Sequence, residues 1–403
     1  MISMYYKTFK VRLFPTKDQE KMLWKHIHTC RAFWNFMLEL NIDTLNSFNK
    51  RLSYYEMCKI ITTLKEYEEM QWLNDVSLHS LQRVCDNLND AYQKHFKNPK
   101  NYGYPKFKGR KKSVNSFPIS SYNAENRFIS NDCIKICRCG RIKCRFNYRT
   151  INFDKIKDKP FLNPQITFTN NGKWILTFSL EHENQVFKNK NNSLGLDMGI
   201  KDAAIYSYKD KDGIIHSDTI ENLNKDKKLK KLDYEIIKLE RIISRKYRTS
   251  KRLGYEFRSS NRYRKTVNKL RKLYYHRMNI IKDYYHKSSS HIVYDIHPSF
   301  IFIEDLNISG LLKNRRVSKN IAYVSWYSFQ IMLQYKAERI GIPICKVPRF
   351  YPSSQICSNC GSIHKLKLSE RTYFCPDCGL IIDRDINASI NLMNYNQGLY
   401  RFS

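Results

Sequence analysis

The carboxyl-terminal part of the chain contains two closely spaced pairs of cysteines. Cys357 and Cys360 form one Cys-x-x-Cys-Gly sequence, and Cys375 and Cys378 form a second after fourteen intervening residues. Two such turns can place four thiolates tetrahedrally around one Zn²⁺ ion, and the glycine after each pair eases the turn of the chain. Because four cysteines close the coordination sphere, this spacing predicts a structural zinc site rather than a catalytic one.

Three acidic residues stand out by their sequence context. Asp197 follows the apolar stretch Leu-Gly-Leu, Glu304 ends the stretch Phe-Ile-Phe-Ile-Glu, and Asp385 begins a helical pattern just past the cysteine pairs. A carboxylate on an apolar strand costs free energy unless it is paired or bound to a metal ion. Three such carboxylates can converge on two Mg²⁺ ions, one activating water and the other stabilising the leaving oxygen of a cleaved phosphodiester.

Each of these acids also has a simpler interpretation. Asp197 could be a turn residue, Glu304 a charge at a strand end, and Asp385 a helix cap. Among the neighbouring acids, Asp305 should point to the opposite strand face from Glu304, and Asp383 is expected to support the start of the helix. The residues by themselves leave these alternatives open.

A second group of cysteines has no familiar metal-ligand spacing. It comprises Cys133, Cys137, Cys139 and Cys144. The group lies in a stretch that reads as a strand hairpin, where alternating small apolar residues are expected. We therefore interpret these cysteines as part of a sheet.

The charge of the chain favours a polyanionic partner. Lys and Arg number 71 against 37 Asp and Glu, which gives a formal net charge of +34 over 403 residues. A membrane surface is the rival polyanion, but the basic residues run through the whole chain and no amphipathic anchor stands out. No apolar stretch approaches the roughly 18 residues of a membrane span. The first residues lack the apolar centre of a signal peptide, so we expect a cytoplasmic protein, associated with the nucleoid of a prokaryote or reaching the nucleus if its host has one.

The apolar patterns predict the elements that must position these residues. Residues 6–14 alternate like a strand, and Thr16 with Gln19 fits a capping box for a long helix. Further helices are expected over 53–68 and 76–97, and a linker or nucleic-acid loop over 98–113. Short strands are expected over 115–188, with hairpin turns at Gly140 and at the Asn-Asn-Gly sequence that ends at Gly172, and a helical hairpin over 225–290. The hairpin has 22 Lys and Arg against 6 Asp and Glu, which favours a helix pair facing nucleic acid over a merely solvated surface.

The order of these features resembles the TnpB family of transposon-encoded RNA-guided DNA endonucleases, which is related to the miniature type V CRISPR effector nucleases. The order is strand Asp, basic hairpin, strand Glu, cysteine pairs, helix Asp. The resemblance extends over nearly the whole chain and is carried by these matching segments: KVRLFPTKDQE, SLQRVCDNLNDAYQKHF, YGYPKFKGRKK, GLDMGIKDAAIYS, FIEDLNISGLLKNRR, WYSFQIMLQYKAERIGIPICKV, YPSSQICSNCG, FCPDCG and DRDINASINL.

This resemblance implies an α/β fold with four parts. An RNase H-like (RuvC) nuclease domain would span 190–350 and 380–403, with the basic hairpin at about 225–290 and a zinc ribbon inserted at 351–379. A β-barrel wedge domain over 1–14 and 114–189 and a helical recognition domain over 15–113 would precede it. The family's catalytic acids match Asp197, Glu304 and Asp385, which would bind Mg²⁺, and its zinc ligands match the four paired cysteines.

The resemblance also implies the partners. A guide RNA made from the transposon end would select double-stranded target DNA, with one protein chain per guide, while protein contacts read a short adjacent DNA motif. Tyr54 and Gln82 match positions that face this motif, although both could equally be helix-surface residues.

Three other functions compete with this one. They are a cleavage-deficient guided repressor, a transposase acting in strand transfer, and a zinc-ribbon RNA-binding protein without chemistry. The presence of all three acids argues against the first, and cysteine pairs between the second and third acids do not fit the transposase fold.

Overall fold

The computed structural model divides the chain into two units, Met4–Glu183 and Asn184–Ser403. The described residues are 4–110, 113–120, 126–146, 153–157, 159, 162–183, 192–199, 201–254, 256, 260–305, 326–367 and 370–395. Several predicted features extend beyond them: the last two residues of YGYPKFKGRKK, Ile200 of GLDMGIKDAAIYS, and FIEDLNISGLLKNRR after Asp305. No helix among the described residues combines the length and the apolar character needed to cross a bilayer.

The Met4–Glu183 unit is built on an antiparallel sheet whose described strands follow the order β2-β6-β7-β1-β5-β4-β3. The strands are β1 (Met4–Phe14), β2 (Asn115–Pro118), β3 (Arg127–Ser130), β4 (Cys133–Ile136), β5 (Gly140–Arg145), β6 (Leu162–Phe168) and β7 (Trp174–Glu183). Both predicted hairpin turns are confirmed, since Gly140 and Gly172 adopt the positive φ values of 74° and 77° that glycine tolerates. The described ladder leaves β2 and β3 at its two edges.

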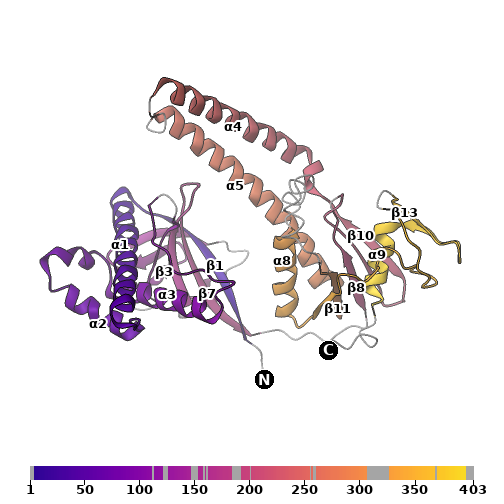
Figure 1. The fold of residues 1–403 in the computed structure, drawn as a ribbon, viewed down its shortest axis with the longest axis horizontal. Helices are drawn as coiled ribbons and strands as arrows, with labels where there is room; N and C mark the ends of the chain where they lie inside the picture. Colours follow the sequence, from indigo (N-terminus) through magenta and orange to yellow (C-terminus); the bar gives the residue numbers. More distant parts are fainter. Residues whose placement is uncertain are drawn as a thin grey trace. The chain divides into compact units, whose positions relative to one another are not determined.

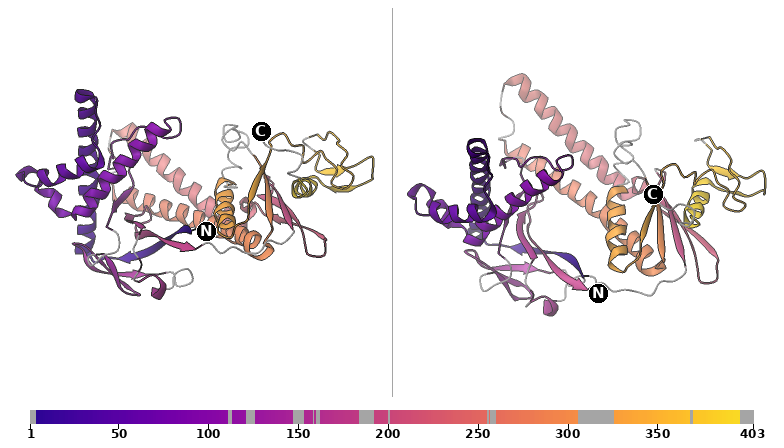
Figure 2. Two further views of the ribbon diagram at one scale, coloured as in Figure 1. Left: turned by 90° about the horizontal axis from the view of Figure 1, so that it is seen from below. Right: turned by 60° about the horizontal axis from the view of Figure 1, so that its bottom comes forward.

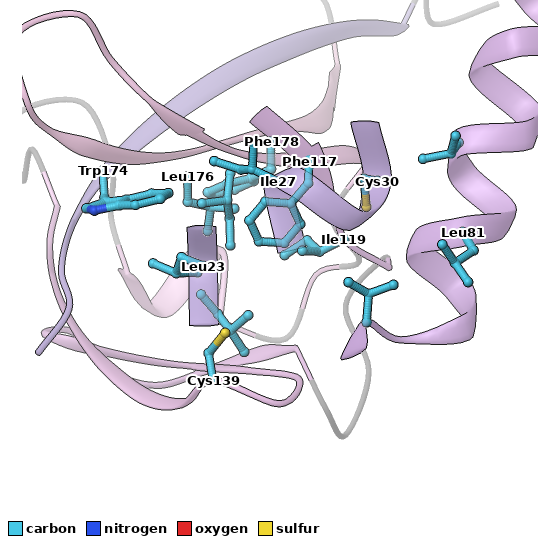
Figure 3. Packing of buried hydrophobic residues seen from close by; sticks show 14 of the residues in the cluster. Leu23, Ile27, Cys30, Leu81, Phe117, Ile119, Cys139, Trp174, Leu176 and Phe178 are labelled. Atoms are coloured by element: carbon cyan, nitrogen blue, oxygen red, sulfur yellow. The ribbon is translucent and has the colours of Figure 1, made fainter. Parts of the chain in front are cut away.

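The helices of this unit share one core with the sheet. They are α1 (Lys17–Phe48), α2 (Tyr54–Leu64), the 3₁₀ helix η1 (Glu68–Asp75) and α3 (Leu78–Lys97). The predicted capping box begins α1, because the Thr16 side chain accepts from the backbone of Gln19 and the Gln19 side chain accepts from that of Thr16. Figure 3 shows Leu23 and Ile27 of α1 packed beside Phe117, Leu176 and Phe178 of the sheet.

Two predicted elements of this unit differ in detail from the structure. The helix expected over 53–68 ends at Leu64, and the chain continues as η1. The described part of the expected loop over 98–113 is held against α1: Trp34 donates to the carbonyl of Lys106 at 3.1 Å, and Asn35 exchanges two hydrogen bonds with the backbone of Lys108.

The Asn184–Ser403 unit contains a mixed sheet with the strand order β10-β9-β8-β11-β12. The strands are β8 (Ser193–Asp197), β9 (Ala204–Lys209), β10 (Ile215–Ile220), β11 (Phe300–Glu304) and β12 (Ile344–Val347). The pairs β10–β9 and β9–β8 are antiparallel, whereas β8–β11 and β11–β12 are parallel. Parallel neighbours end at the same edge of a sheet, so the ends of β8 and β11 lie together.

Both faces of this sheet are covered. Leu194, Leu196 and Ile301 belong to a core with side chains of α5 (Asn261–Ser290), the π-helix His291–Ile296 and α8 (Trp326–Arg339). On the other face, α9 (Arg384–Met393) lies along β8 (Figure 1) and packs Leu392 with Phe302. The short 3₁₀ turn η3 (Leu223–Lys225) precedes the helical hairpin.

The predicted basic hairpin is confirmed as a long antiparallel pair of helices, α4 (Lys227–Leu253) and α5 (Figure 1 and Figure 2). Asp226 caps the start of α4, and Gly254 ends it with a φ of 69°. The buried apolar residues of the pair lie near its base, for example Leu229 on α4 and Tyr285 on α5. The rest of the pair therefore presents its cations to solvent.

Gly195 of β8 sets the distance between the sheet and α9. A Cβ atom built on this residue would lie less than 3.0 Å from backbone atoms of Ser389, Leu392 and Met393. These atoms belong to the helix backbone, which no side-chain rotation can move away. Only glycine permits this approach.

Gly195→Ala should therefore destabilise the Asn184–Ser403 unit by at least about 3 kcal/mol, because α9 must move off the sheet. Calorimetric unfolding of the full chain, with hydrogen exchange in α9, measures the effect. Gly103→Ala is the matched control, since its added methyl group meets nothing within 4 Å. An unchanged unfolding midpoint in Gly195→Ala would show that this contact does not restrain α9.

Candidate functional site

Two of the three predicted acids end neighbouring strands. Ile303 of β11 pairs with Leu196 of β8, so Glu304 and Asp197 come next in register at the same sheet edge. Side chains alternate along a strand, which places Asp197 on the face of Gly195 and Glu304 on the face of Phe302. This is the face that α9 covers.

The third acid is brought to this face by the start of α9. The Asp383 carboxylate caps the helix by accepting from the backbone N–H groups of Asp385 at 2.8 Å and Ile386 at 3.3 Å. The expected role of Asp383 is thus confirmed, and Asp385 lies in the first helical turn. The anionic cap is also favoured by the helix dipole.

The three carboxylates interact electrostatically. Burial raises the pKa of Asp197 well above its ordinary value, and the negative charges of Glu304 and Asp385 raise this pKa further, while Arg384 opposes them. Burial also raises the pKa of Glu304, against a lowering effect of the Ser353 hydroxyl, which donates to Glu304 Oε1 at 2.7 Å. Buried like charges at one place favour a bound cation.

Asp385 and Asp305, the acid that follows Glu304, have different ion-pair partners. Asp385 lies 3.6 Å from Arg371 and 3.5 Å from Arg384 in partly screened ion pairs. Asp305 instead pairs with Arg349 at 3.1 Å and is not brought into the acid group. Among the described residues, groups of three or more potential metal-ligand atoms within 4.8 Å of one another are found only in the cysteine region. The carboxylate oxygens of the three acids are therefore spaced more widely than the sulfur atoms of the paired cysteines.

The four paired cysteines come together as predicted, between β12 and α9. The sulfur atoms of Cys357 and Cys378 lie 3.5 Å apart, as do those of Cys360 and Cys375. Bonds of about 2.3 Å to a tetrahedral Zn²⁺ would separate the sulfurs by about 3.8 Å. The hydrogen bonds of Ser362 lower the pKa of Cys360 to about 6, which favours the thiolate needed for metal binding.

The cysteine region includes a histidine that the sequence interpretation missed. His364 Nε2 lies 3.1 Å from an oxygen of Asp377 and 3.8 Å from the sulfur of Cys375. Its position between the two cysteine pairs was the available signal. Ser353, the partner of Glu304, was also missed, although it lies in the quoted segment YPSSQICSNCG.

The other cysteine group does not gather in the same way. In the described part of the chain, Cys133, Cys137, Cys139 and Cys144 form no cluster of metal-ligand distances. Cys139 and Cys144 are instead 6% and 5% exposed and pack in the apolar core of the sheet. These findings favour the sheet interpretation.

Comparison with known families matches three models along the chain. Residues 177–315 match the model described as "Probable transposase", and residues 326–392 match "Cas12f1-like, TNB domain". Residues 1–50 match "Helix-turn-helix domain". Where this last region is described, it forms β1 and the single long helix α1.

Relatives match over nearly the full length. A "Putative RNA-guided DNA endonuclease" of Streptomyces pristinaespiralis is 26% identical, over 98% of this chain and 90% of its own. The "TnpB-like protein L79" of Acanthamoeba polyphaga mimivirus is 26% identical over 95% of this chain and 72% of its own. A "Putative transposase" of Methanocaldococcus jannaschii is 35% identical, over 20% of this chain and 80% of its own. The chain belongs to the TnpB family.

Solved structures share the fold of this TnpB chain. The protein in "Cryo-EM structure of the Cas12f1-sgRNA-target DNA complex" has a TM-score of 0.61 at 13% identity, covering 97% of this chain and 99% of that one. The "mini-RNA-guided endonuclease CRISPR-Cas_phi3" has a TM-score of 0.56 at 11% identity, covering 97% and 92%. The mixed α/β fold expected of the TnpB family is therefore present.

The two predicted motif-facing residues of this TnpB chain lie in the Met4–Glu183 unit. A hydrogen bond with Cys58 and burial raise the pKa of Tyr54 to about 12, and the charge of Asp86 on α3 contributes. Gln82 lies one turn before Asp86 and contacts His79 at 3.2 Å. Residues one turn apart share a helix face, so Gln82 and Asp86 lie on the same side of α3.

Zinc analysis of the purified TnpB chain should give one ion per chain. Cys375→Ser should lose it, because three remaining thiolates leave the site open, whereas Cys133→Ser should retain it. Elemental analysis by mass spectrometry provides the measurement. Two ions per wild-type chain, or loss of an ion in Cys133→Ser, would contradict the assignment of the metal to the paired cysteines alone.

Proposed function

We propose that this chain is an RNA-guided DNA endonuclease in which Asp197, Glu304 and Asp385 form a Mg²⁺-dependent nuclease site. One observation carries the proposal: three carboxylates, from β8, β11 and α9, lie on one face of a mixed sheet and interact through their charges. The charges of Glu304 and Asp385 raise the pKa of Asp197, and the charge of Asp385 raises the pKa of Glu304. The strand order, with three antiparallel strands followed by two parallel additions, supports an RNase H-like (RuvC) domain.

The residues fit the hard cation that this chemistry requires. Carboxylate oxygens are the ligands that Mg²⁺ prefers, and the buried charges of Asp197 and Glu304 gain from a cation. Bound there as a pair of ions, Mg²⁺ would supply an activated water and charge stabilisation for the leaving oxygen, as in two-metal hydrolysis. Ser353 holds Glu304 in place, and Arg384 and Arg371 hold Asp385.

Zn²⁺ at the four paired cysteines would have a structural role. The described sheet β13 (Thr372–Phe374) with β14 (Ile381–Asp383) has little apolar core of its own, comprising Tyr373 and the cysteines with a few half-buried neighbours. A bound metal therefore contributes the folding free energy that packing does not supply. The four thiols lie close together and form no disulfide bonds, so this donor set fits Zn²⁺.

The charge distribution supports nucleic-acid partners. The chain carries a formal charge of +34, and the α4–α5 hairpin presents many of its cations to solvent. We propose that one chain binds one guide RNA made from the transposon end, and that this RNA selects double-stranded DNA beside a short motif. Tyr54 and Gln82 would face that motif.

The proposed domains subdivide the two units. The Met4–Glu183 unit would hold the recognition domain (15–113) and most of the wedge domain (1–14 and 114–189). The other unit would hold the nuclease domain (190–350 and 380–403) and the zinc ribbon (351–379). The sheet and α1 share one core, so the first two proposed domains would pack closely together.

Transposition by strand transfer is the second candidate function, favoured by the two matches that are named as transposases. Strand transfer also uses carboxylates and two metal ions. A cleavage-deficient guided repressor would retain the RNA and DNA binding without the acids. The three carboxylates argue for the nuclease over the repressor.

Replacing a proposed ligand tests the nuclease site. Asp197→Asn and Glu304→Gln should each lower the rate of guided DNA cleavage on the order of a thousandfold, since a metal ligand supplies several kcal/mol. Guide and target binding should be unchanged. Plasmid cleavage and filter binding with the assembled RNA complex provide the measurements. Asp305→Asn is the matched control, and cleavage that survives both variants would refute the site.

The variant Asp197→Asn also tests how the acid group affects the stability of the fold when no divalent ion is present. Folding buries Asp197 beside two like charges and raises its pKa, so ionisation of this group destabilises the folded state as pH rises above the unfolded value of 3.8. At pH 7, Asp197→Asn should therefore unfold at the same or a higher temperature than wild type. Mg²⁺ should raise the melting temperature of wild type only. A lower melting temperature of the variant in EDTA would contradict this account.

A substitution at Gln82 tests the proposed motif contact. Gln82→Ala should change the preference at one position of the target-adjacent motif by about 1–3 kcal/mol, the worth of one amide–base contact. Cleavage of a plasmid library with a randomised motif measures this preference. Gln71→Ala, elsewhere in the same unit, is the control; identical motif profiles for wild type and Gln82→Ala would remove Gln82 from motif reading.

A further inference from the structure

Two buried asparagines on α9 need an explanation. Asn387 and Asn391 lie one turn apart and are 0% and 4% exposed. Asparagine is a poor residue for a helix interior, and a buried amide costs free energy unless it is hydrogen-bonded. Apolar residues would cover the sheet as well, so the amides must do something that apolar side chains cannot.

The partners of both amides belong to one short segment, residues 353–358. Asn387 donates to the carbonyl of Ile356 at 2.7 Å and accepts from the backbone N–H of Ser358 at 3.0 Å. Asn391 donates to the carbonyls of Ser353 and Ile356, both at 2.7 Å. This segment contains Cys357, the first ligand of the cysteine site, so the amides attach α9 to the first cysteine turn.

Ser353 joins this network to the acid group. Its carbonyl accepts from Asn391, and its hydroxyl donates to Glu304 Oε1 at 2.7 Å. The residue is 4% exposed, so water does not compete for either bond. Glu304 of β11 is thereby connected, through a single residue, to the helix that carries Asp385 in its first turn.

The second side of the cysteine region holds the start of the same helix. Asp383 ends β14, pairs with Thr372 of β13, and caps α9. Arg384 extends the connection by donating its backbone N–H to the carbonyl of Arg371 at 2.8 Å. The start of α9 is therefore held by the β13–β14 hairpin, which carries the second cysteine pair. The rest of the helix is held by residues 353–358, which contain Cys357 of the first pair.

We propose that Ser353, Asn387 and Asn391 are positioning residues, here called the polar clamp. They hold Asp385 and Glu304 at the separation needed to bind the catalytic cation. The clamp makes that separation depend on the folded cysteine turn. Zinc binding at the ribbon is thus coupled to the acid group through hydrogen bonds of 2.7–3.0 Å. This inference rests on the proposed nuclease function.

The test separates positioning from stability. Ser353→Ala removes the hydroxyl bond to Glu304 but leaves the carbonyl for Asn391, and Ser353→Thr retains the hydroxyl. Asn391→Leu removes two donated bonds at similar volume. Asn394→Ala, on the exposed end of α9, is the matched control. Each variant is prepared as the full chain with its guide RNA.

Three quantities are measured on each complex: Mn²⁺ affinity by electron paramagnetic resonance, zinc content, and the Mg²⁺ dependence of cleavage. Ser353→Ala and Asn391→Leu should weaken Mn²⁺ binding about 10–100-fold, the effect typical of groups that orient metal ligands. The half-saturating Mg²⁺ concentration should rise in parallel. Zinc content and guided DNA binding should stay at wild-type values, and Ser353→Thr should restore Mn²⁺ affinity.

The outcomes distinguish this inference from the function on which it rests. If wild type binds Mn²⁺ and cuts, but Ser353→Ala has wild-type Mn²⁺ affinity, the clamp proposal alone is overturned. If Asn391→Leu does not fold, Ser353→Ala still decides. If wild type neither binds Mn²⁺ nor cuts guided DNA, the proposed nuclease function fails and the inference fails with it.

Discussion

The close approach of α9 to β8 at Gly195 is the contact on which the candidate site depends. The helix backbone occupies the space that any side chain at residue 195 would fill. Because Asp385 lies in the first turn of α9, the distance of this helix from the sheet decides whether the third carboxylate reaches the other two. A glycine two residues before Asp197 is therefore part of the site without contributing any chemical group.

Bringing three acids together works against the stability of the fold. Burial and mutual repulsion raise the pKa values of Asp197 and Glu304, so ionising these groups costs more free energy in the folded chain than in the unfolded chain. The surrounding hydrogen bonds and the arginines beside Asp385 limit this cost. The cation that we propose for this site would offset the remaining repulsion.

The sequence predicted best those features that depend on neighbouring residues. The capping box at Thr16, the glycine turns, the hairpin of α4 and α5 and the pairing of the cysteines all follow from local spacing. The end of α2 at Leu64 was missed because the apolar pattern continues into η1, and periodicity does not separate a 3₁₀ turn from an α-helix over a few residues. The barrel expected of the first unit is a sheet ladder with two edges among the described strands.

The candidate site was predictable in part for the same reason. The acids and cysteines stand out by residue type, and the resemblance to the TnpB family assigned the three acids to one site and the four cysteines to another. The contacts of Ser353, Asn387 and Asn391 join residues up to 49 positions apart and depend on tertiary packing, so spacing gave no signal for them. His364 could have been noticed from its place between the cysteine pairs, but its contact with Asp377 could not.

The most direct test of the central claim is to purify the chain from cells that carry its native flanking DNA, sequence the bound RNA, and incubate the complex with a motif-randomised plasmid library and Mg²⁺. The account predicts a bound RNA derived from the element end, and cleavage that requires both the guide match and a short adjacent motif. Bound RNA without cutting would indicate a guided repressor. The absence of any specific RNA would contradict the account and favour strand transfer or RNA binding alone.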